Sequence, residues 1–130
     1  MPPKQRVVVF NDNPLIRNAI IDDVTLEGHT VAGIASDLEG LKNELRRLDG
    51  SELDSLLFLV DNSAPRESGG VTGDVGPEAA VMILTYFPEA RVVAVSTSRE
   101  KLGFGEAHWR PGEDPIGENI TALPPRKESR

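Results

Sequence analysis

The chain has 130 residues, no cysteine and a formal net charge of −7. This length suits one domain that buries a core without covalent staples, and the lack of cysteine excludes disulfide bonds and thiolate metal sites. The negative charge opposes the phosphates of nucleic acids, so we expect no direct nucleic-acid partner. No apolar run approaches the length of a membrane span, and the first residues lack a signal-peptide core, so we expect a soluble, cytoplasmic protein that does not contact membranes.

A strand and a helix are predicted first. Residues 7–10 (VVVF) form an apolar run, and Asn13 followed by Pro14 is typical of the cap and first position of a helix. Gly28 is expected to end this helix. Its predicted buried stripe consists of Leu15, Ile16, Ala19, Ile20 and Val24.

The same alternation then repeats. Residues 30–35 (TVAGIA) predict a second strand, and Ser36 with Glu39 has the pattern of a capping box. The second helix is expected to end at Gly50. The side chains expected on its buried face are Leu38, Leu41, Leu45 and Leu48.

The third strand ends on a carboxylate. Residues 56–60 (LLFLV) form a short continuous apolar run, which indicates a strand buried on both faces, and Asp61 follows at its exit. Residues 62–76 are rich in Gly and Ser and predict a loop of more than the usual length. Within it, residues 68–76 (SGGVTGDVG) lack the Lys and Ser/Thr of a phosphate-binding loop, which favours a flexible loop over a nucleotide site.

The last third of the sequence contains weaker patterns. Pro77 is expected to start a third helix, and residues 91–96 predict a fourth strand. Residues 97–106 are too few and too Gly-rich for a long helix, 107–109 suggest a short fifth strand, and 114–123 suggest a final short helix. The expected buried side of the third helix is Ala80, Val81, Ile83, Leu84 and Phe87.

Alternating strands and helices predict an α/β domain with a parallel sheet and helices on both of its faces. We expect one domain over residues 1–125 and a disordered tail over 126–130. The carboxyl ends of parallel strands meet at one edge, where ligands bind in open sheets. Asn11 and Asp12 follow the first strand, Asp61 the third, and Ser96 ends the fourth, so these polar side chains are expected along one rim.

In this order and spacing the chain resembles the receiver domains of two-component response regulators. Residues 7–17 (VVVFNDNPLIR) are similar to the family's acidic pair and the Pro-Leu-Ile-Arg that follows it. Asp61, with Pro four residues on and Gly eight residues on, matches the phosphoacceptor loop. Residues 88–97 resemble the fourth strand, whose end carries a Ser or Thr, and Arg110 with its following Pro stands where the family has Lys-Pro.

The resemblance implies a flavodoxin-like three-layer sandwich with a five-stranded parallel sheet in the order 2-1-3-4-5 and a shortened fourth-helix region. It also implies that Asp61 is the phosphoacceptor and that Mg²⁺ is bound by Asp12, Asp61 and the backbone carbonyl of Ser63. Ser96 is then expected to hydrogen-bond the phosphoryl group, and Arg110 to pair with it. The chemistry needs a carboxylate nucleophile and a hard cation beside the transferred charge.

Two departures from the family pattern affect this site. Asn11 replaces one carboxylate of the acidic pair, so it offers only an amide oxygen to the metal and the affinity for Mg²⁺ should fall. Arg110 replaces the family's lysine with a planar guanidinium, which is not a conservative exchange. Asp12 is equally compatible with a simpler role as a favourable charge at a helix start.

Three functions are compatible with this sequence. The first is a receiver that accepts a phosphoryl group from a histidine kinase and acts through another signalling protein or by forming a homodimer. The second is a pseudo-receiver, in which the same fold serves as an interaction module without phosphorylation. The third, a phosphatase with a strand-end Asp nucleophile, is disfavoured because Ser63 stands where that class carries a second Asp. We therefore expect no enzyme activity beyond self-catalysed transfer to Asp61.

Overall fold

The computed structural model describes residues 6–48, 56–95, 105 and 107–109. Their main feature is a five-stranded sheet in the order β2-β1-β3-β6-β7, in which all neighbouring strands run parallel. The strands are β1 (Arg6–Phe10), β2 (Thr30–Ala35), β3 (Leu56–Asp61), β6 (Arg91–Val95) and β7 (Ala107–Trp109). Since β6 and β7 are the predicted fourth and fifth strands, the expected fold and strand order are confirmed.

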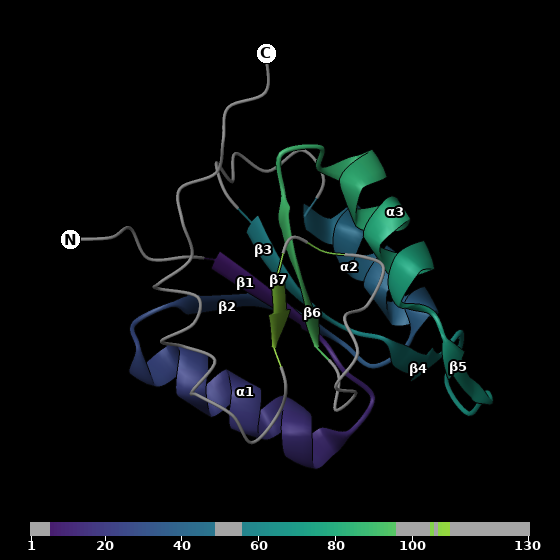
Figure 1. Ribbon diagram of the computed structural model, residues 1–130, viewed down its shortest axis with the longest axis horizontal. Helices are drawn as coiled ribbons and strands as arrows, with labels where there is room; N and C mark the ends of the chain where they lie inside the picture. Colours follow the sequence, from purple (N-terminus) through teal and green to yellow (C-terminus); the bar gives the residue numbers. More distant parts are fainter. Residues whose placement is uncertain (1–5, 49–55, 96–104, 106, 110–130) are drawn as a thin grey trace.

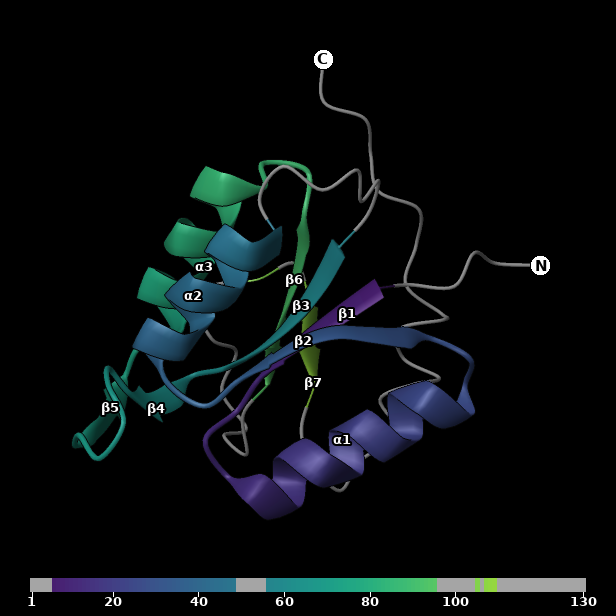
Figure 2. The same ribbon diagram turned by 180° about the vertical axis from the view of Figure 1, so that it is seen from behind.

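Helices cover the sheet on both sides, as predicted (Figure 1). α1 (Pro14–Leu26) lies on one face, whereas α2 (Leu38–Leu48) and α3 (Gly76–Tyr86) lie together on the other, which is clearest from behind (Figure 2). The alternating side chains of β1 and β3 therefore enter two separate apolar clusters, and Leu56 to Val60 are all buried. None of the described helices is long and apolar enough to cross a membrane.

The start of α1 follows the prediction, whereas its buried face does not. Asn13 Oδ1 accepts hydrogen bonds from the backbone N–H of Leu15 at 3.0 Å and of Ile16 at 3.3 Å, so it is the N-cap. Leu15 is 81% exposed, and only Ile20 and Val24 are buried. The predictions for Leu15 and Ala19 were wrong, because the side that packs on the sheet is the row of Ile16, Ile20 and Val24. Leu15 and Ala19 each precede a residue of this row by one position, which is about 100° around the helix.

Asp37, not Ser36, caps α2. The Asp37 carboxylate accepts a hydrogen bond from the N–H of Gly40 at 2.6 Å, while Ser36 Oγ accepts one from the Arg17 side chain. The N-cap is therefore one residue later than predicted, and Gly40 at the N3 position has no side chain to complete a capping box. All four leucines predicted for the buried face of α2 are buried.

α3 begins at Gly76 and buries a narrower face than predicted. Ala79, Ala80 and Ile83 are buried against the sheet, whereas Val81 is 67% and Leu84 is 40% exposed. Nearly every residue of this helix is apolar, so the sequence pattern alone does not identify the side that packs.

The segment after Asp61 contains a hairpin where the sequence predicted only a loop. β4 (Ser63–Pro65) and β5 (Thr72–Asp74) form an antiparallel two-stranded sheet. The hairpin is fixed to both nearby helices, because the carbonyl of Arg66 accepts from the N–H of Glu39 at 2.9 Å and its guanidinium pairs with Glu78 at 2.7 Å. Residues 97–104 and 106, and the predicted helix 114–123, lie outside the described part of the chain.

Strand β2 is an edge strand, and two side chains of α2 cover its free backbone groups. Glu44 Oε1 accepts from the N–H of Ile34 at 3.3 Å, and Arg47 Nη2 donates to the carbonyl of Ala32 at 2.6 Å. Glu44 and Arg47 also form an ion pair at 2.9 Å. They reach the strand across Gly33, where an added Cβ would lie 2.7 Å from Glu44 Oε1.

We expect Gly33→Ala to lower the free energy of unfolding by about 1 kcal/mol, because the methyl group displaces Glu44 and leaves the Ile34 N–H without its acceptor. Urea denaturation measures the loss, and amide exchange at Ile34 should accelerate. Gly73→Ala is the matched control, since a Cβ there meets nothing within 4 Å. Equal stability of the two variants would contradict the prediction.

Candidate acidic site at the carboxyl edge of the sheet

The structure brings together two of the predicted acidic side chains. β1 and β3 are adjacent parallel strands in register from Arg6 opposite Leu56 to Phe10 opposite Val60. Asp61 is the last residue of β3, and Asp12 follows two residues after the end of β1. Both carboxyl groups are half-buried at the same edge, and they share a hydrogen bond.

The environment of Asp61 strongly favours its neutral form. Its pKa is raised from 3.8 to about 7, chiefly by burial, and the hydrogen bond and repulsion from the adjacent carboxylate of Asp12 act in the same direction. The backbone N–H groups of Ser63 and Asn62 lower the pKa, and the Ser63 N–H lies 3.2 Å from Asp61 Oδ1. The two adjacent carboxyl groups form a site suited to a cation.

Asn11 has a structural role that its sequence position did not reveal. Its side chain is 2% exposed, and Oδ1 accepts a hydrogen bond from the N–H of Asn13 at 2.9 Å. Its own N–H donates to the carbonyl of Ala35 at 3.0 Å, which extends the β1–β2 pairing beyond the strand. The amide therefore holds the turn that carries Asp12, and its oxygen accepts this bond with one of its two lone pairs.

The other predicted site residues are only partly described. Ser63 is the first residue of β4 and lies next to Asp61, as the predicted carbonyl ligand must. Ser96 and Arg110 lie outside the described residues; the described part of the fourth strand ends at Val95, opposite Asp61. Their roles as phosphoryl partners stay predictions.

The donor set fits a hard divalent cation that retains water. Among the described residues, no group of three or more His, Asp or Glu side chains is placed to hold a metal ion. Mg²⁺ needs only one or two carboxylates because it keeps several waters, and Asp12 with Asp61 supplies two. A dication would also relieve the repulsion between these carboxylates, so the residues present fit Mg²⁺.

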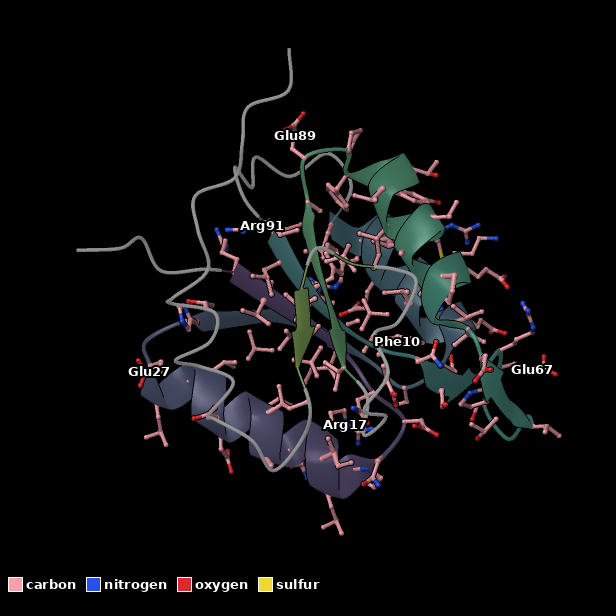
Figure 3. The ribbon with its side chains drawn as sticks, in the orientation of Figure 1. Phe10, Arg17, Glu27, Glu67, Glu89 and Arg91 are labelled. Atoms are coloured by element: carbon pink, nitrogen blue, oxygen red, sulfur yellow. The ribbon has the colours of Figure 1, made fainter. Side chains whose placement is uncertain are left out.

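Sequence reasoning missed Arg17, which supports this edge from α1. Its Nη1 donates to the carbonyl of Asn11 at 3.1 Å and to Ser36 Oγ at 3.1 Å. Figure 3 shows the Arg17 side chain extending from α1 toward the carboxyl ends of the strands. The sequence feature that could have indicated this role is a basic residue four positions after the N-cap. The interpretation of this helix used only its apolar residues.

Comparison with solved structures identifies the fold. The NMR structure of the PhyR receiver domain from Erythrobacter litoralis is 19% identical, with a TM-score of 0.63 over 91% of this chain and 86% of that one. The signal receiver domain of NarL from Mycobacterium tuberculosis is 24% identical, with a TM-score of 0.66 over 92% of this chain and 94% of that one. A chain of the CheX–CheY complex with BeF₃⁻ and Mg²⁺ from Borrelia burgdorferi is 18% identical, with a TM-score of 0.60 over 75% of this chain and 65% of that one.

No model of a known protein family matches the sequence, and neither does any curated protein sequence. At identities below 25% the structural likeness establishes the fold alone. The resemblance noted in the sequence is thus confirmed at the level of architecture, and this chain carries its acidic side chains at the carboxyl edge of the sheet. The chain has the fold of a response regulator receiver domain.

Proposed function

We propose that this protein is a receiver-like domain of two-component signalling that accepts a phosphoryl group on Asp61 with the help of Mg²⁺. The observation that carries the proposal is the pair of carboxyl groups, Asp12 and Asp61, at the carboxyl edge of the parallel sheet. The CheX–CheY match, whose solved complex contains BeF₃⁻ and Mg²⁺, supports it. The phosphoryl donor would be a histidine kinase or another signalling protein.

The chemistry requires Asp61 as an ionised nucleophile. A pKa of about 7 leaves a substantial fraction ionised at neutral pH, and that fraction rises in more alkaline solution. A carboxylate oxygen of Asp61 then bonds to phosphorus while the bond from phosphorus to the donor breaks, and the donor leaves with the electron pair. Bound Mg²⁺ would neutralise charge on the carboxylates and on the transferred group. The chain catalyses nothing beyond this modification of itself.

Phosphorylation by a small donor tests the proposal. With Mg²⁺ and acetyl phosphate we expect the intact mass to increase by one phosphoryl group, and hydroxylamine to remove it, as it cleaves acyl phosphates. Asp61→Asn should abolish the increase. Asp22→Asn is the matched control, because Asp22 is an exposed acid of α1 and should leave the reaction unchanged. An unmodified wild-type chain in Mg²⁺ would refute phosphorylation of Asp61.

A second candidate function is a pseudo-receiver that signals through protein contacts, including self-association, without phosphorylation. It is favoured by one observation at the same edge: Asn11 replaces a carboxylate, and its amide oxygen is held by the Asn13 N–H. A site with one acidic ligand fewer binds Mg²⁺ more weakly. The absence of both modification and Mg²⁺ binding at millimolar concentrations would support this function.

A further inference from the structure

The turn that carries Asp12 is tied to the neighbouring strand by few bonds. The Asn11 N–H donates to the carbonyl of Ala35 at the end of β2, and the Asn13 N–H closes the turn on Asn11 Oδ1. Arg17 adds the connection that spans all three segments, because one nitrogen of its guanidinium contacts both the Asn11 carbonyl and Ser36 Oγ. α1, the Asp12 turn and the end of β2 are thereby joined at one point.

Such a connection matters because the two carboxyl groups of the site repel each other when both are ionised. The repulsion raises the free energy of any arrangement that holds Asp12 beside Asp61, so the backbone must resist it. β3 fixes Asp61 within the sheet, whereas Asp12 lies outside β1, in the turn. The restraint on Asp12 therefore has to come from the contacts of the turn itself.

The contacts of Arg17 connect neighbouring segments of the backbone. Within the described part of the chain, both acceptors of its guanidinium are neutral oxygens, one from the backbone and one from a serine hydroxyl. It is half-buried, so these charge-assisted bonds are partly shielded from water. Its described contacts thus act on the position of the turn.

We propose that Arg17 is a positioning residue, which holds Asp12 at the distance from Asp61 at which both carboxylates bind one divalent cation, with Ser36 as its anchor just after β2. The inference rests on the proposed function, since it concerns the same site. It assigns a role in metal binding to two residues that need not touch the metal. Removal of such supporting contacts commonly lowers metal affinity about 10- to 100-fold.

Mg²⁺ affinity measured by titration calorimetry on four variants tests this role. Arg17→Met should weaken Mg²⁺ binding about tenfold, and Ser36→Ala, which changes no charge, should weaken it about threefold. Arg17→Lys retains a donor and should recover part of the loss. Arg46→Met is the matched control: Arg46 is exposed on α2, and its removal changes the net charge equally but should leave the affinity unchanged.

The thermal midpoint of each variant separates positioning from a general loss of stability. Weaker Mg²⁺ binding by a Ser36→Ala variant that unfolds at the wild-type temperature supports the inference, even if Arg17→Met fails to fold. Wild-type affinity in both Arg17→Met and Ser36→Ala would overturn it and leave the proposed function intact. A wild-type chain that binds no Mg²⁺ would overturn the proposed function and the inference together.

Discussion

Asp61→Asn is expected to stabilise the metal-free fold by about 2 kcal/mol at pH 8 and to have little effect near pH 4. The pKa of Asp61 is about 7 in the folded chain against an ordinary value of 3.8, so the folded state holds this proton more tightly than the unfolded state. Between these two pKa values the free energy of unfolding of the wild type falls as pH rises. Above about pH 7 Asp61 is ionised in both the folded and the unfolded state, so the destabilisation has reached its full size. Asn does not titrate and avoids this cost.

The magnitude follows from the same two pKa values. At about 1.36 kcal/mol per pKa unit they correspond to about 4 kcal/mol. Asp61 is only half-buried, and screening by solvent reduces this figure to about 2 kcal/mol. The side-chain amide introduced by the substitution would retain an oxygen for the Ser63 N–H, so the geometry of the turn should survive.

Urea denaturation at pH 5 and pH 8 in the presence of a chelator measures this effect. The stabilisation by Asp61→Asn should be clearly larger at pH 8, while Asp22→Asn, at an exposed position of α1, should show no such dependence. Adding Mg²⁺ in excess should reduce the difference in stability between Asp61→Asn and the wild type at pH 8, since a ligand of the folded state stabilises the wild type. The same gain at both pH values would show that burial and repulsion at Asp61 are not its source.

Phe58→Ala is expected to lower the free energy of unfolding by about 3–5 kcal/mol. Phe58 is fully buried in β3, and its ring lies against that of Phe87, with the ring centroids 6.4 Å apart and the planes tilted by 33°. Truncation removes the apolar contacts and leaves a cavity beneath α3 that the packed sheet cannot fill. The loss is a large part of the stability of an ordinary domain.

Leu15→Ala is the matched control for this change. Leu15 is an apolar residue of α1, but it is 81% exposed, so its truncation should alter stability by less than about 0.5 kcal/mol. Urea midpoints at constant slope measure both effects. A large loss in Leu15→Ala would mean that Leu15 packs against the sheet, as its apolar pattern predicts.

These two residues also show how far the sequence predicts the fold. The run at residues 56–60 could be interpreted without ambiguity, because a short apolar segment between turn formers has few alternatives to a buried strand. Leu15 could not be placed, because apolar residues occupy neighbouring positions at the start of α1 and the sequence does not show whether the row of Leu15 or that of Ile16 faces the sheet. In α3 nearly all residues are apolar, and Val81 and Leu84 were assigned to the core in place of Ala79.

Some residues of the candidate site could be predicted from the sequence, and others could not. Asp12 and Asp61 were predicted to meet because parallel strands place their carboxyl ends on one edge, which follows from topology alone. Asp37 as the cap of α2 and Arg17 as a brace depend on bonds between a side chain and the backbone, or between distant segments. Such bonds depend on final coordinates and leave no periodic pattern in a sequence.

The parallel arrangement also determines when the acidic site can form during folding. The central strand β1 pairs with two partners that lie far along the chain, as Val7 is opposite both Val31 and Leu57. The chain loses conformational entropy when it closes such long loops, before the strand pairing stabilises it. Folding is therefore slower than in proteins built from local contacts. A nascent chain therefore lacks its candidate phosphoacceptor site until β3 has been synthesised and has docked beside β1, however early the first helix forms.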